Sequence, residues 1–546
     1  MLDLWYKNAV IYCIDVETFM DSNGDGVGDF QGLADRLDHI EELGATCIWL
    51  LPFYPSPNRD NGYDVTDFYG VDPRLGTLGD FVAFTHAAQD RGLRVIVDLV
   101  ANHTSIDHPW FQEARRDPQS RYRDWYVWSK EKPDNIHEGV VFPGVQDSIW
   151  TYDEVAEAWY MHRFYKHQAD LNIANEEVRA EIEKVMGFWL QLGVSGFRLD
   201  AVPFLIEYKG LPERERPKHD PHEYLRELRD VLSWRRAEAV MLAEANITMD
   251  QVDEYFGRSG ERMHMILNFM LNQHVFLSLA RGDAKPIRDI MRDTPEIPLK
   301  AQWGSFLRNH DELDLGRLKD EERQEVFSRF GPAPDMQLYG RGLRRRLAPM
   351  LDGDEQWLKL AFSLMFALPA TPVLWYGDEI GMGEDLSLKE RNAVRTPMQW
   401  ADEPNAGFSM ASADKLVRPV ISDGPFAYQR VNVASQRDLD GSLMSHLQRL
   451  VRTRRACPEV GWARGEILQT EDTSLLAIRY DWEGATVITL HNLADRPAEA
   501  RLQLDGIDQM RPLLSSEDDR SMKKAASPIK LEPYGFRWFR AHGERR

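Results

Sequence analysis

Cysteine is scarce in this chain of 546 residues, which contains only Cys13, Cys47 and Cys457. Three cysteines without metal-ligand spacing or a paired framework exclude a disulfide scaffold and a thiolate metal centre. The N-terminal segment also lacks a basic stretch followed by an apolar one, which is the pattern of a secretory signal peptide. These absences favour a reducing compartment, and we expect a cytoplasmic protein.

Long hydrophobic runs are missing as well. The longest apolar region, residues 360–376, contains Pro369 and Pro372 and is typical of a buried helix followed by a strand, not of a membrane span. The sequence has no Gly-rich phosphate loop and no dinucleotide fingerprint. It therefore indicates no organic cofactor.

Basic residues are fewer than acidic ones: the chain has 66 Lys and Arg residues and 88 Asp and Glu residues, which gives a formal net charge of −22. Such an acidic chain is not expected to bind nucleic acid or an anionic membrane, because both partners are themselves negative. A neutral small-molecule substrate is compatible with this charge. The sequence leaves open whether the protein forms a homo-oligomer.

Eight short apolar segments alternate with segments of helical periodicity. Alternation of this kind predicts parallel βα units, and eight units predict a closed (β/α)8 TIM barrel in the α/β class. The expected strands are Ala9–Ile14, Ala45–Pro52, Leu93–Val100, Gly196–Val202, Ala239–Asn246, Met263–Leu271, Ser305–Asp311 and Thr371–Glu379.

Two long excursions interrupt the alternation. Residues 103–171 are rich in aromatic, His and Asp side chains and predict an inserted subdomain (a B domain) after the third strand. Residues 312–350 are highly charged and predict a second insert after the seventh strand. The barrel is therefore expected over residues 1–102 and 172–465. From residue 466 to 546 the pattern changes to alternation and turns, which predicts a C-terminal all-β sandwich domain.

Carboxylates follow five expected strands, at the edge where a barrel carries its active site. In Gly196–Val202, Arg198 and Asp200 lie two residues apart and share one face of a strand. Taken alone, this pair fits either a buried structural ion pair or an oriented carboxylate nucleophile. A cluster of five repelling carboxylates is costly without a function, and this favours the second interpretation. The cluster comprises Asp98, Asp200, Glu244, Asp311 and Asp378.

Paired carboxylates indicate retaining glycoside chemistry. One carboxylate attacks the anomeric carbon, while the other protonates the leaving oxygen and later removes a proton from the acceptor. Loops rich in aromatic side chains fit a sugar, because ring faces pack on the C–H faces of pyranoses. The residues therefore predict an enzyme acting on glycosidic bonds.

Five short motifs resemble those of the α-amylase superfamily, glycoside hydrolase family 13. They are DLVANH at 98–103, QADLN at 168–172, GFRLDA at 196–201, EAN at 244–246 and NHD at 309–311. The resemblance implies Asp200 as the nucleophile, Glu244 as the general acid/base and Asp311 as a third carboxylate that grips the sugar hydroxyls. The substrate-binding residues that we expect with them are Tyr63, Asp64, His103, Arg198, Asn246, His310, Glu312, Arg391 and Arg395.

Within the family, longer stretches resemble the trehalose synthases (maltose α-D-glucosyltransferases), among them DSNGDGVGDFQGL, WLLPFYPSP, RRRLAPML and RTPMQW. This resemblance implies a small disaccharide substrate and intramolecular transglucosylation that interconverts maltose and trehalose. The alternative is a hydrolase of small α-glucosides. It is motivated by Gly316, which stands where the family's HDELTLE-type segment has its second glutamate, and by an altered first strand.

The loop DSNGDGVGD at 21–29 places oxygen ligands at alternate positions. Such spacing can wrap a hard cation, and the resemblance favours a structural Ca²⁺ or Mg²⁺; the alternative is an Asx-rich turn without metal. Two further residues at the junction of the barrel and the inserted domain could hold a second ion. The expected metal ligands are Asp21, Asn23, Asp25, the Val27 carbonyl and Asp29, with Asn102 and Asp170 for the second ion.

Overall fold

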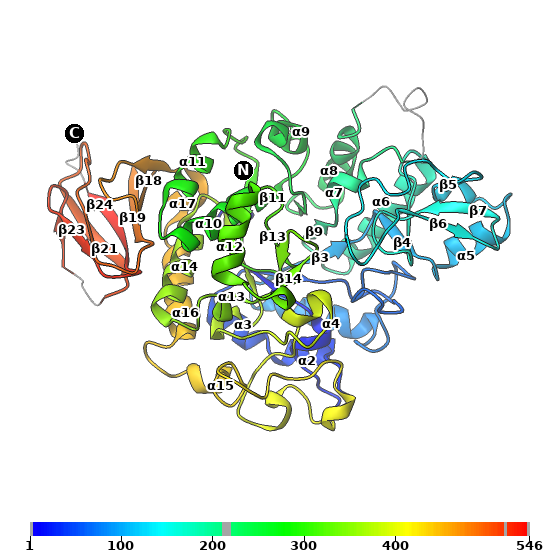
Figure 1. Cartoon of the computed structure of the whole chain (residues 1–546), viewed down its shortest axis with the longest axis horizontal. Helices are drawn as coiled ribbons and strands as arrows, with labels where there is room; N and C mark the ends of the chain where they lie inside the picture. Colours follow the sequence, from blue (N-terminus) through cyan, green and yellow to red (C-terminus); the bar gives the residue numbers. More distant parts are fainter. Residues whose placement is uncertain (1–3, 210–219, 518–520, 543–546) are drawn as a thin grey trace.

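A computed structural model describes residues 4–209, 220–517 and 521–542 of the chain (Figure 1). Its centre is a closed barrel of eight parallel strands in the order β1-β16-β12-β11-β10-β9-β3-β2. The strands are β1 (Ile11–Ile14), β2 (Cys47–Leu50), β3 (Arg94–Leu99), β9 (Gly196–Leu199), β10 (Val240–Ala243), β11 (Met265–Leu267), β12 (Gln302–Ser305) and β16 (Thr371–Trp375).

The barrel strands are apolar because both of their faces are covered. Every residue of β1, β2, β9 and β10 is buried, as expected for strands that lie between a packed interior and an outer ring of helices. Register then fixes which side chains meet at the strand ends. Asp98 on β3 pairs with Arg198 on β9, and Arg198 pairs in turn with Leu242 on β10.

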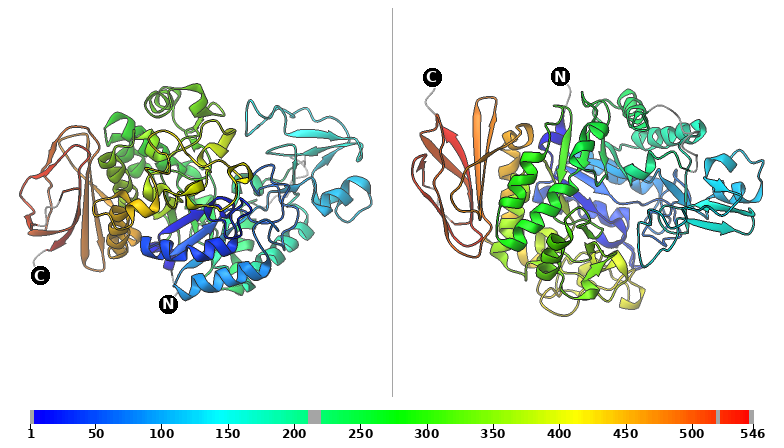
Figure 2. Two further views of the ribbon diagram at one scale, coloured as in Figure 1. Left: turned by 90° about the horizontal axis from the view of Figure 1, so that it is seen from below. Right: turned by 45° about the horizontal axis from the view of Figure 1, so that its top comes forward.

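Helices surround the barrel in all three views (Figures 1 and 2). Those of the barrel and its loops are α1 (Val16–Phe19), α2 (Phe30–Asp35), α3 (Leu37–Leu43), α4 (Leu78–Asp90), α6 (Glu176–Gln191), α7 (Val202–Leu205), α8 (Glu223–Arg235), α9 (Val252–Phe256), α10 (Phe269–Arg281), α11 (Lys285–Asp293), α14 (Glu355–Ala367), α15 (Val433–Gln436), α16 (Leu443–Arg455) and α17 (Pro458–Trp462). Several begin at a side-chain cap; Thr77 and Asp80, for example, form a reciprocal capping box at α4.

Two insertions, called excursions here, lie beside the carboxyl ends of the barrel strands. The inserted domain contains α5 (Pro109–Arg116), a pair of strands β4 (His103–Ser105) and β8 (Gln168–Asp170), and a sheet of β5 (Trp128–Ser129), β7 (Ala158–Met161) and β6 (Trp150–Asp153). The second insert contains α12 (Asp320–Phe330), α13 (Leu347–Met350) and a small sheet of β13 (Leu313–Asp314), β15 (Gly342–Leu343) and β14 (Gln337–Leu338).

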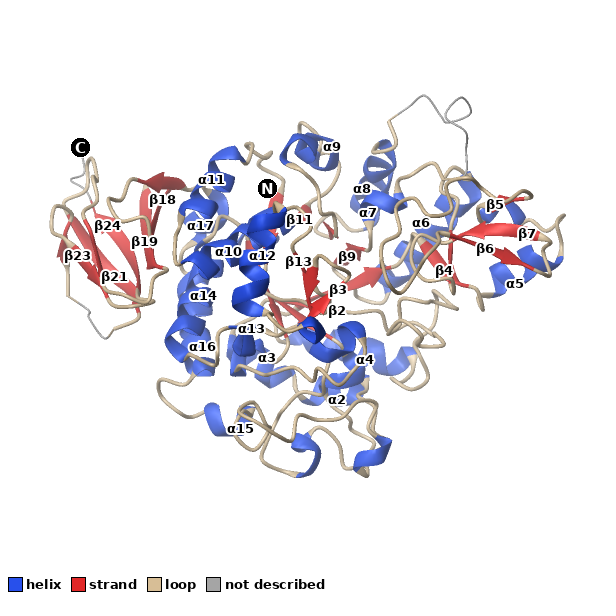
Figure 3. Ribbon diagram, in the orientation of Figure 1, coloured by secondary structure: helices blue, strands red, loops and turns tan. Residues whose placement is uncertain are grey.

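The C-terminal part is an all-β domain at the end of the molecule opposite the inserted domain (Figure 3). A six-stranded sheet has the order β17 (Glu466–Leu468), β18 (Leu475–Trp482), β19 (Ala485–Asn492), β24 (Phe536–His542), β21 (Gln509–Ser515) and β22 (Lys523–Lys524), and β20 (Ala498–Ala500) pairs with β23 (Ile529–Leu531). Alternate residues of β18 face two hydrophobic cores. Leu476 and Ile478 pack in the main core, whereas Leu475 and Ala477 pack in the core of the C-terminal domain. Trp538 Nε1 donates to Ser363 Oγ of α14 at 2.9 Å and ties the sheet to the barrel.

The expected barrel class and its eight strands are confirmed, but the seventh strand was predicted in the wrong place. It spans Gln302–Ser305, and the predicted segment from Ser305 to Asp311 is mainly the loop that follows it. The polar run Arg308-Asn309-His310-Asp311 belongs to this loop and not to a strand. Among the described residues, no helix combines the length and apolarity needed to cross a membrane.

Candidate active site

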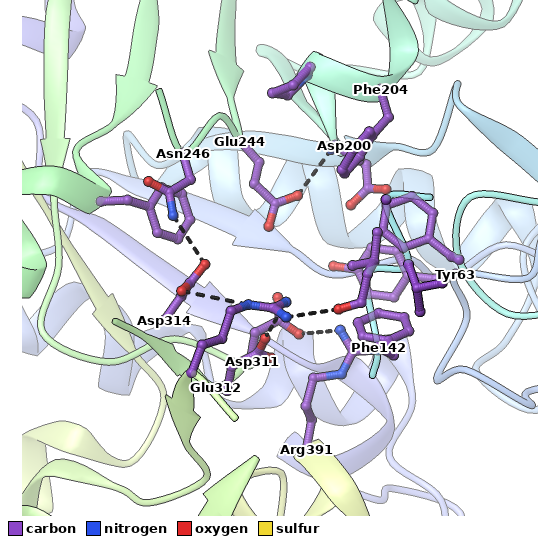
Figure 4. A pocket seen from close by; sticks show the side chains of 18 of the residues that line it. Tyr63, Phe142, Asp200, Phe204, Glu244, Asn246, Asp311, Glu312, Asp314 and Arg391 are labelled. Carbon is purple, nitrogen blue, oxygen red and sulfur yellow. Dashed lines mark hydrogen bonds and ion pairs between the residues drawn. The ribbon is translucent and has the colours of Figure 1, made fainter. Parts of the chain in front are cut away.

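A cavity of about 500 Å³ opens at the carboxyl ends of the barrel strands, between the inserted domain and the second insert (Figure 4). Its floor comes from the barrel and its sides from the two excursions. It is lined by Asp60, Tyr63, His103, Gly139, Val140, Val141, Phe142, Phe164, Asp200, Ala201, Pro203, Phe204, Glu244, Asn246, Phe269, Asp311, Glu312, Asp314, Arg317, Arg341 and Arg391.

The guanidinium of Arg198 holds the carboxylates on the floor. Its Nη1 lies 2.6 Å from Asp200 Oδ1, and its Nη2 lies 2.8 Å from Glu244 Oε2. Asp98, at the end of the neighbouring strand, lies 3.2 Å from the same Nη1. Arg198 is buried, so these charge-assisted contacts are shielded from water and fix the orientation of both carboxylates.

A left-handed residue directly after Asp200 links Asp200 to Glu244. Ala201 has φ 48° and ψ 44°, which turns the chain out of β9 and into α7. The turn frees the Ala201 amide from the sheet, and this amide donates to Glu244 Oε2 at 3.0 Å. Strained backbone of this kind is tolerated where the surrounding structure enforces it, as at active sites.

Burial raises the proton affinity of both Asp200 and Glu244. It raises the pKa of Asp200 to about 6 and that of Glu244 to about 7, while Arg198 opposes both shifts and neighbouring carboxylates add to them. Near neutral pH, Asp200 is therefore mostly ionised and Glu244 retains a substantial protonated fraction. One ionised and one protonated carboxyl group in the same site is the combination that a nucleophile and a general acid require.

Asp311 is surrounded by nitrogen donors, two of them arginines, on the opposite wall from Glu244 (Figure 4). Its carboxylate lies 3.0 Å from His310 Nε2, 2.8 Å from Arg391 Nη1 and 3.0 Å from Arg395 Nη2. Burial acts to raise the pKa of Asp311, but His310 and Arg391 outweigh burial and hold it well below its usual range. Asp311 is therefore a fixed negative charge that can accept hydrogen bonds from sugar hydroxyls.

Tyr63 forms the aromatic face of the floor. Its hydroxyl donates to Asp98 Oδ2 at 2.8 Å and also lies 2.8 Å from His310 Nε2. The Tyr63 and His310 rings are nearly parallel, with centroids 5.8 Å apart. His103 Nε2 donates to the main-chain oxygen of Tyr63 at 3.0 Å, so the histidine also fixes the position of the tyrosine.

The structure distributes the expected substrate-binding residues between the cavity surface and the shell behind it. Arg198, His310 and Arg395 orient residues of the cavity surface and do not line the cavity themselves. The expected residues that line it are Tyr63, His103, Asn246, Glu312 and Arg391, together with Asp200, Glu244 and Asp311.

Asp64 contradicts the expectation of a substrate contact. It is buried away from the cavity, and its carboxylate accepts hydrogen bonds from Ser56 Oγ and from the backbone amides of Arg59 and Asp60. The cavity residue is instead Asp60, whose carboxylate lies 2.8 Å from Arg391 Nη2. The motif NGYDV indicated the correct loop, but the turn at Asn61 and Gly62 brings the earlier aspartate to the cavity.

Sequence reasoning predicted Asn246 and Glu312 but missed Asp314, Arg317 and Arg341 on the same wall. Asn246 Nδ2 donates to Asp314 Oδ2 at 3.0 Å, and Arg341 lies 3.3 Å from Glu312 Oε1. Gly316 is exposed and is not part of the lining. The charged segment GRGLRRRL was a signal for this wall, but nothing in the sequence indicated which of its arginines reaches the cavity.

The predicted second metal site is occupied by a lysine. Lys209 Nζ lies 2.9 Å from Asp170 Oδ2 and donates to Asn102 Oδ1 at 2.5 Å, and all three side chains are buried. An ammonium group thus supplies the positive charge between the barrel and the inserted domain. The prediction that Asn102 and Asp170 bind a metal ion is therefore wrong.

The loop at residues 21–29 keeps the oxygen donors that a hard cation prefers, but its acids already accept hydrogen bonds. Asp21 accepts from the amides of Asn23, Gly24 and Gly26, and Asp29 caps α2. Among residues 4–209, 220–517 and 521–542, no three His, Cys, Asp or Glu side chains gather to hold a metal. A cation here would therefore need the Asn23 amide oxygen and the Val27 carbonyl in addition to the carboxylates.

Comparison with known families places the catalytic chemistry in context. The family described as the alpha amylase catalytic domain matches residues 13–328 and 344–462, and the sucrose hydrolase-like C-terminal domain matches residues 484–540. Among solved structures, the isomaltulose synthase SmuA from Protaminobacter rubrum is 25% identical with a TM-score of 0.79, covering 98% of this chain and 99% of that chain. An alpha-amylase from H. orenii is 26% identical with a TM-score of 0.78, covering 98% and 100%.

Curated relatives match over nearly the whole chain. The trehalose synthase/amylase TreS of Mycobacterium tuberculosis is 42% identical over 544 residues, covering 98% of this chain and 90% of the relative. The trehalose synthase of Thermus thermophilus is 42% identical over 540 residues, covering 98% and 55%. The oligo-1,6-glucosidase of Bacillus cereus is 30% identical over 531 residues, covering 87% and 88%. The chain therefore belongs to the α-amylase family, glycoside hydrolase family 13.

Proposed function

We propose that the protein interconverts maltose and trehalose by moving one glucosyl group within this cavity. The observation that carries this proposal is the position of Asp200 and Glu244 at the floor of a cavity of about 500 Å³. Contacts between the inserted domain and the second insert, Arg341 with Val141 and Phe142 with Tyr339, narrow its mouth and are called the roof below. This volume suits a small ligand. The trehalose synthases among the relatives support the choice of disaccharide.

In the first step, Asp200 attacks the anomeric carbon of the bound glucosyl unit. The glycosidic bond breaks, and Glu244 gives its proton to the departing oxygen. Asp311 accepts hydrogen bonds from hydroxyls of the same sugar and stabilises the positive charge that develops on the ring. Arg198 keeps both catalytic carboxylates in place throughout.

In the second step, the freed glucose turns within the cavity and presents its own anomeric hydroxyl. Glu244, now ionised, removes the proton from this hydroxyl, whose oxygen attacks the glucosyl carbon and releases Asp200. The new bond joins two anomeric carbons, as in trehalose. Water entering at this stage would give two glucose molecules, so the roof decides which product forms.

The donor end of the cavity is closed by an ion pair between Asp60 and Arg391. The Arg391 guanidinium also lies over the ring of Phe142 from the inserted domain, 5.0 Å from its centroid. These contacts support a site for a single terminal glucosyl unit and not for the interior of a long polysaccharide.

The second candidate is a hydrolase of small α-glucosides, supported by the missing side chain at Gly316 and by the oligo-1,6-glucosidase relatives. Incubation with maltose, and separately with trehalose, distinguishes the two when anomeric signals are followed by NMR. Trehalose formed from maltose with little free glucose supports the synthase. Glucose as the sole product from both disaccharides would refute it.

We also propose that the loop at residues 21–29 binds one structural Ca²⁺ or Mg²⁺ through its oxygen donors, without a part in the reaction. Mass spectrometry of the purified protein should then detect close to one bound ion, and Asp25→Ala should lose it. Asp35→Ala is the control, because Asp35 is exposed on α2 and bonds only Gln31 among the described partners. An ion-free protein would contradict this proposal.

We further propose that the protein works in a reducing compartment, the cytoplasm. Cys13, Cys47 and Cys457 are buried and form no disulfide bonds, which supports this location. A cytoplasmic enzyme would meet maltose and trehalose as intracellular disaccharides. Cell fractionation followed by immunoblotting tests the location.

A further inference from the structure

Arg341 reaches across the mouth of the cavity from the tip of the β14–β15 hairpin. Its Nη1 donates to the main-chain oxygen of Val141, in the inserted domain, at 2.8 Å. On its other side, Nη2 lies 3.3 Å from Glu312 Oε1 and Nε lies 3.7 Å from Asp314 Oδ1. One guanidinium thus connects the inserted domain with the acidic wall that faces the leaving group.

Two glycines allow this approach. A Cβ added at Gly342 would lie 2.6 Å from Glu312 Cγ, so only glycine lets the hairpin pack this closely against that glutamate. A Cβ added at Gly316 would lie 3.2 Å from Arg341 Cδ. The side chain absent at Gly316 therefore leaves the space that the stem of Arg341 uses. The main chain is fixed as well, because Leu315 N donates to Arg341 O at 2.9 Å.

An apolar contact closes the roof beside Arg341. The ring of Phe142, from the inserted domain, packs on the ring of Tyr339, from the hairpin, with centroids 4.8 Å apart. Tyr339 has φ 55° and precedes Gly340 at φ 68°, so the turn is held in a left-handed conformation that directs Arg341 toward the cavity. The roof therefore combines one apolar contact and one polar contact between the two excursions.

We propose that Arg341 determines the fate of the glucosyl group: it retains the freed glucose in the cavity and keeps water out, and so sets the ratio of transfer to hydrolysis. The inference rests on the proposed function, because it concerns the acceptor of the same glucosyl-enzyme. Arg341 lines the cavity and is only partly exposed, so its remaining N–H donors can bind hydroxyls of the acceptor.

The role is one of specificity and leaves the covalent chemistry unchanged. The ester bond to Asp200 breaks in either outcome, and Glu244 removes the proton from whichever oxygen attacks. With glucose held in place, the attacking oxygen is its anomeric hydroxyl, and the product is a disaccharide. With glucose lost, the attacking oxygen is that of water, and the product is glucose.

The test compares Arg341→Ala with Arg329→Ala, a control on α12 of the same insert whose partner Asp352 is on the outer surface. Three quantities are measured: the ratio of trehalose to glucose formed from maltose, the release of p-nitrophenol from p-nitrophenyl α-glucoside, and the inhibition constant of glucose against that release. For Arg341→Ala we expect the ratio to fall by about tenfold, the size of effect of losing hydrogen bonds to a charged group. The initial burst rate of p-nitrophenol release should change by less than about threefold, because glucosylation does not use the acceptor.

The inhibition constant separates this inference from the proposed function. Glucose should bind about tenfold more weakly to Arg341→Ala than to the wild-type protein and to Arg329→Ala, whichever product the wild type makes. If the wild type yields only glucose from maltose, the isomerase assignment fails, yet a weakened glucose site in Arg341→Ala still supports the role of Arg341. A product ratio and a glucose inhibition constant within about twofold of wild type would overturn it.

Arg341→Gln provides a second variant if the alanine variant does not fold. It keeps a polar side chain but cannot span both Val141 and Glu312 with a charged group. For Arg341→Gln we expect the trehalose-to-glucose ratio to fall and glucose to bind more weakly, as in Arg341→Ala but by a smaller factor. An unchanged glucose inhibition constant in a folded Arg341→Gln protein would also overturn the inference.

Discussion

Lys209 and Asp170 form a buried ion pair, with Nζ 2.9 Å from Oδ2, at the junction of the barrel and the inserted domain. Asp170 ends β8, and Lys209 lies just beyond α7, so the pair connects the last strand of the inserted domain with the segment that follows the nucleophile. The hydrogen bond from Lys209 to Asn102 adds the end of β3 to the same junction. The junction that positions the cavity wall therefore depends on one ammonium group.

Lys209→Met should lower the free energy of unfolding by about 3–5 kcal/mol, because it leaves Asp170 as an uncompensated buried charge. Urea denaturation followed by fluorescence measures the change. Lys184→Met is the matched control, since Lys184 is 67% exposed and pairs with Glu181 on the surface. A loss below about 1 kcal/mol for Lys209→Met would show that the pair does not stabilise the junction.

Asp200→Asn should lower kcat on maltose by about 10⁴-fold or more, because an amide cannot form the covalent glucosyl ester. Product formation is measured by NMR, and circular dichroism verifies the fold. Asp289→Asn is the control and should retain wild-type activity, because the Asp289 side chain is exposed on the outer face of α11. Activity of Asp200→Asn within about tenfold of wild type would disprove the assignment of the nucleophile.

Glu244→Gln should reduce turnover of maltose by about 10³-fold, since a sugar leaving group requires protonation. An activated dinitrophenyl α-glucoside needs little protonation, so its first turnover should survive and the glucosyl-enzyme should accumulate. Azide, which needs no general base, should then restore turnover. Equal losses on both substrates, without azide rescue, would contradict the acid/base role of Glu244.

The pH dependence of kcat/KM should be bell-shaped with its maximum between about 6 and 7. Turnover needs ionised Asp200, whose pKa burial raises to about 6, and protonated Glu244, whose pKa burial raises to about 7. The two apparent pKa values of this profile belong to the interacting pair of carboxyl groups and not to either residue alone. Rates measured across pH 4 to 9 check the profile, and a maximum above pH 8 would contradict it.

The same two shifts predict the direction of a stability effect. Both folded-state pKa values lie above the ordinary values of 3.8 and 4.5, so the folded protein binds these protons more tightly than the unfolded chain does. Their contribution to stability is full below those ordinary values and is lost as the pH rises through about 6 and 7. The Tm of Glu244→Gln relative to wild type should therefore increase from pH 4.5 to pH 8.

The barrel and the carboxylates that its strand ends bring into the cavity could be predicted from the sequence because they depend on local patterns. Buried strands give continuous apolar runs, and Asp200 and Glu244 follow such runs directly. The seventh strand was displaced because the apolar residues Phe306 and Leu307 continue beyond the end of β12 and extend the run. Periodicity does not distinguish a buried loop from a strand when both are apolar.

The errors at the site have a different cause, which is contact between residues far apart in the sequence. Asp60 and Asp64 are the same residue type in the same loop. The conformation of the turn between them determines that Asp60, and not Asp64, contacts Arg391. Asn102 and Asp170 were correctly brought together, but the cation between them is Lys209, whose approach depends on the path after α7. Arg341 could not be selected among its neighbours for the same reason.

The partners of Asp311 and the roof come late in the chain, which has a consequence for synthesis. Arg391 follows Asp311 by 80 residues, and Arg341 follows Val141 by 200 residues. A chain emerging from the ribosome therefore contains Asp200 and Glu244 well before Arg391, which helps to keep Asp311 ionised, and Arg341, which bridges to the inserted domain. The cavity is incomplete until these residues have been synthesised, so we expect a chain that ends before Arg391 to lack activity on disaccharides.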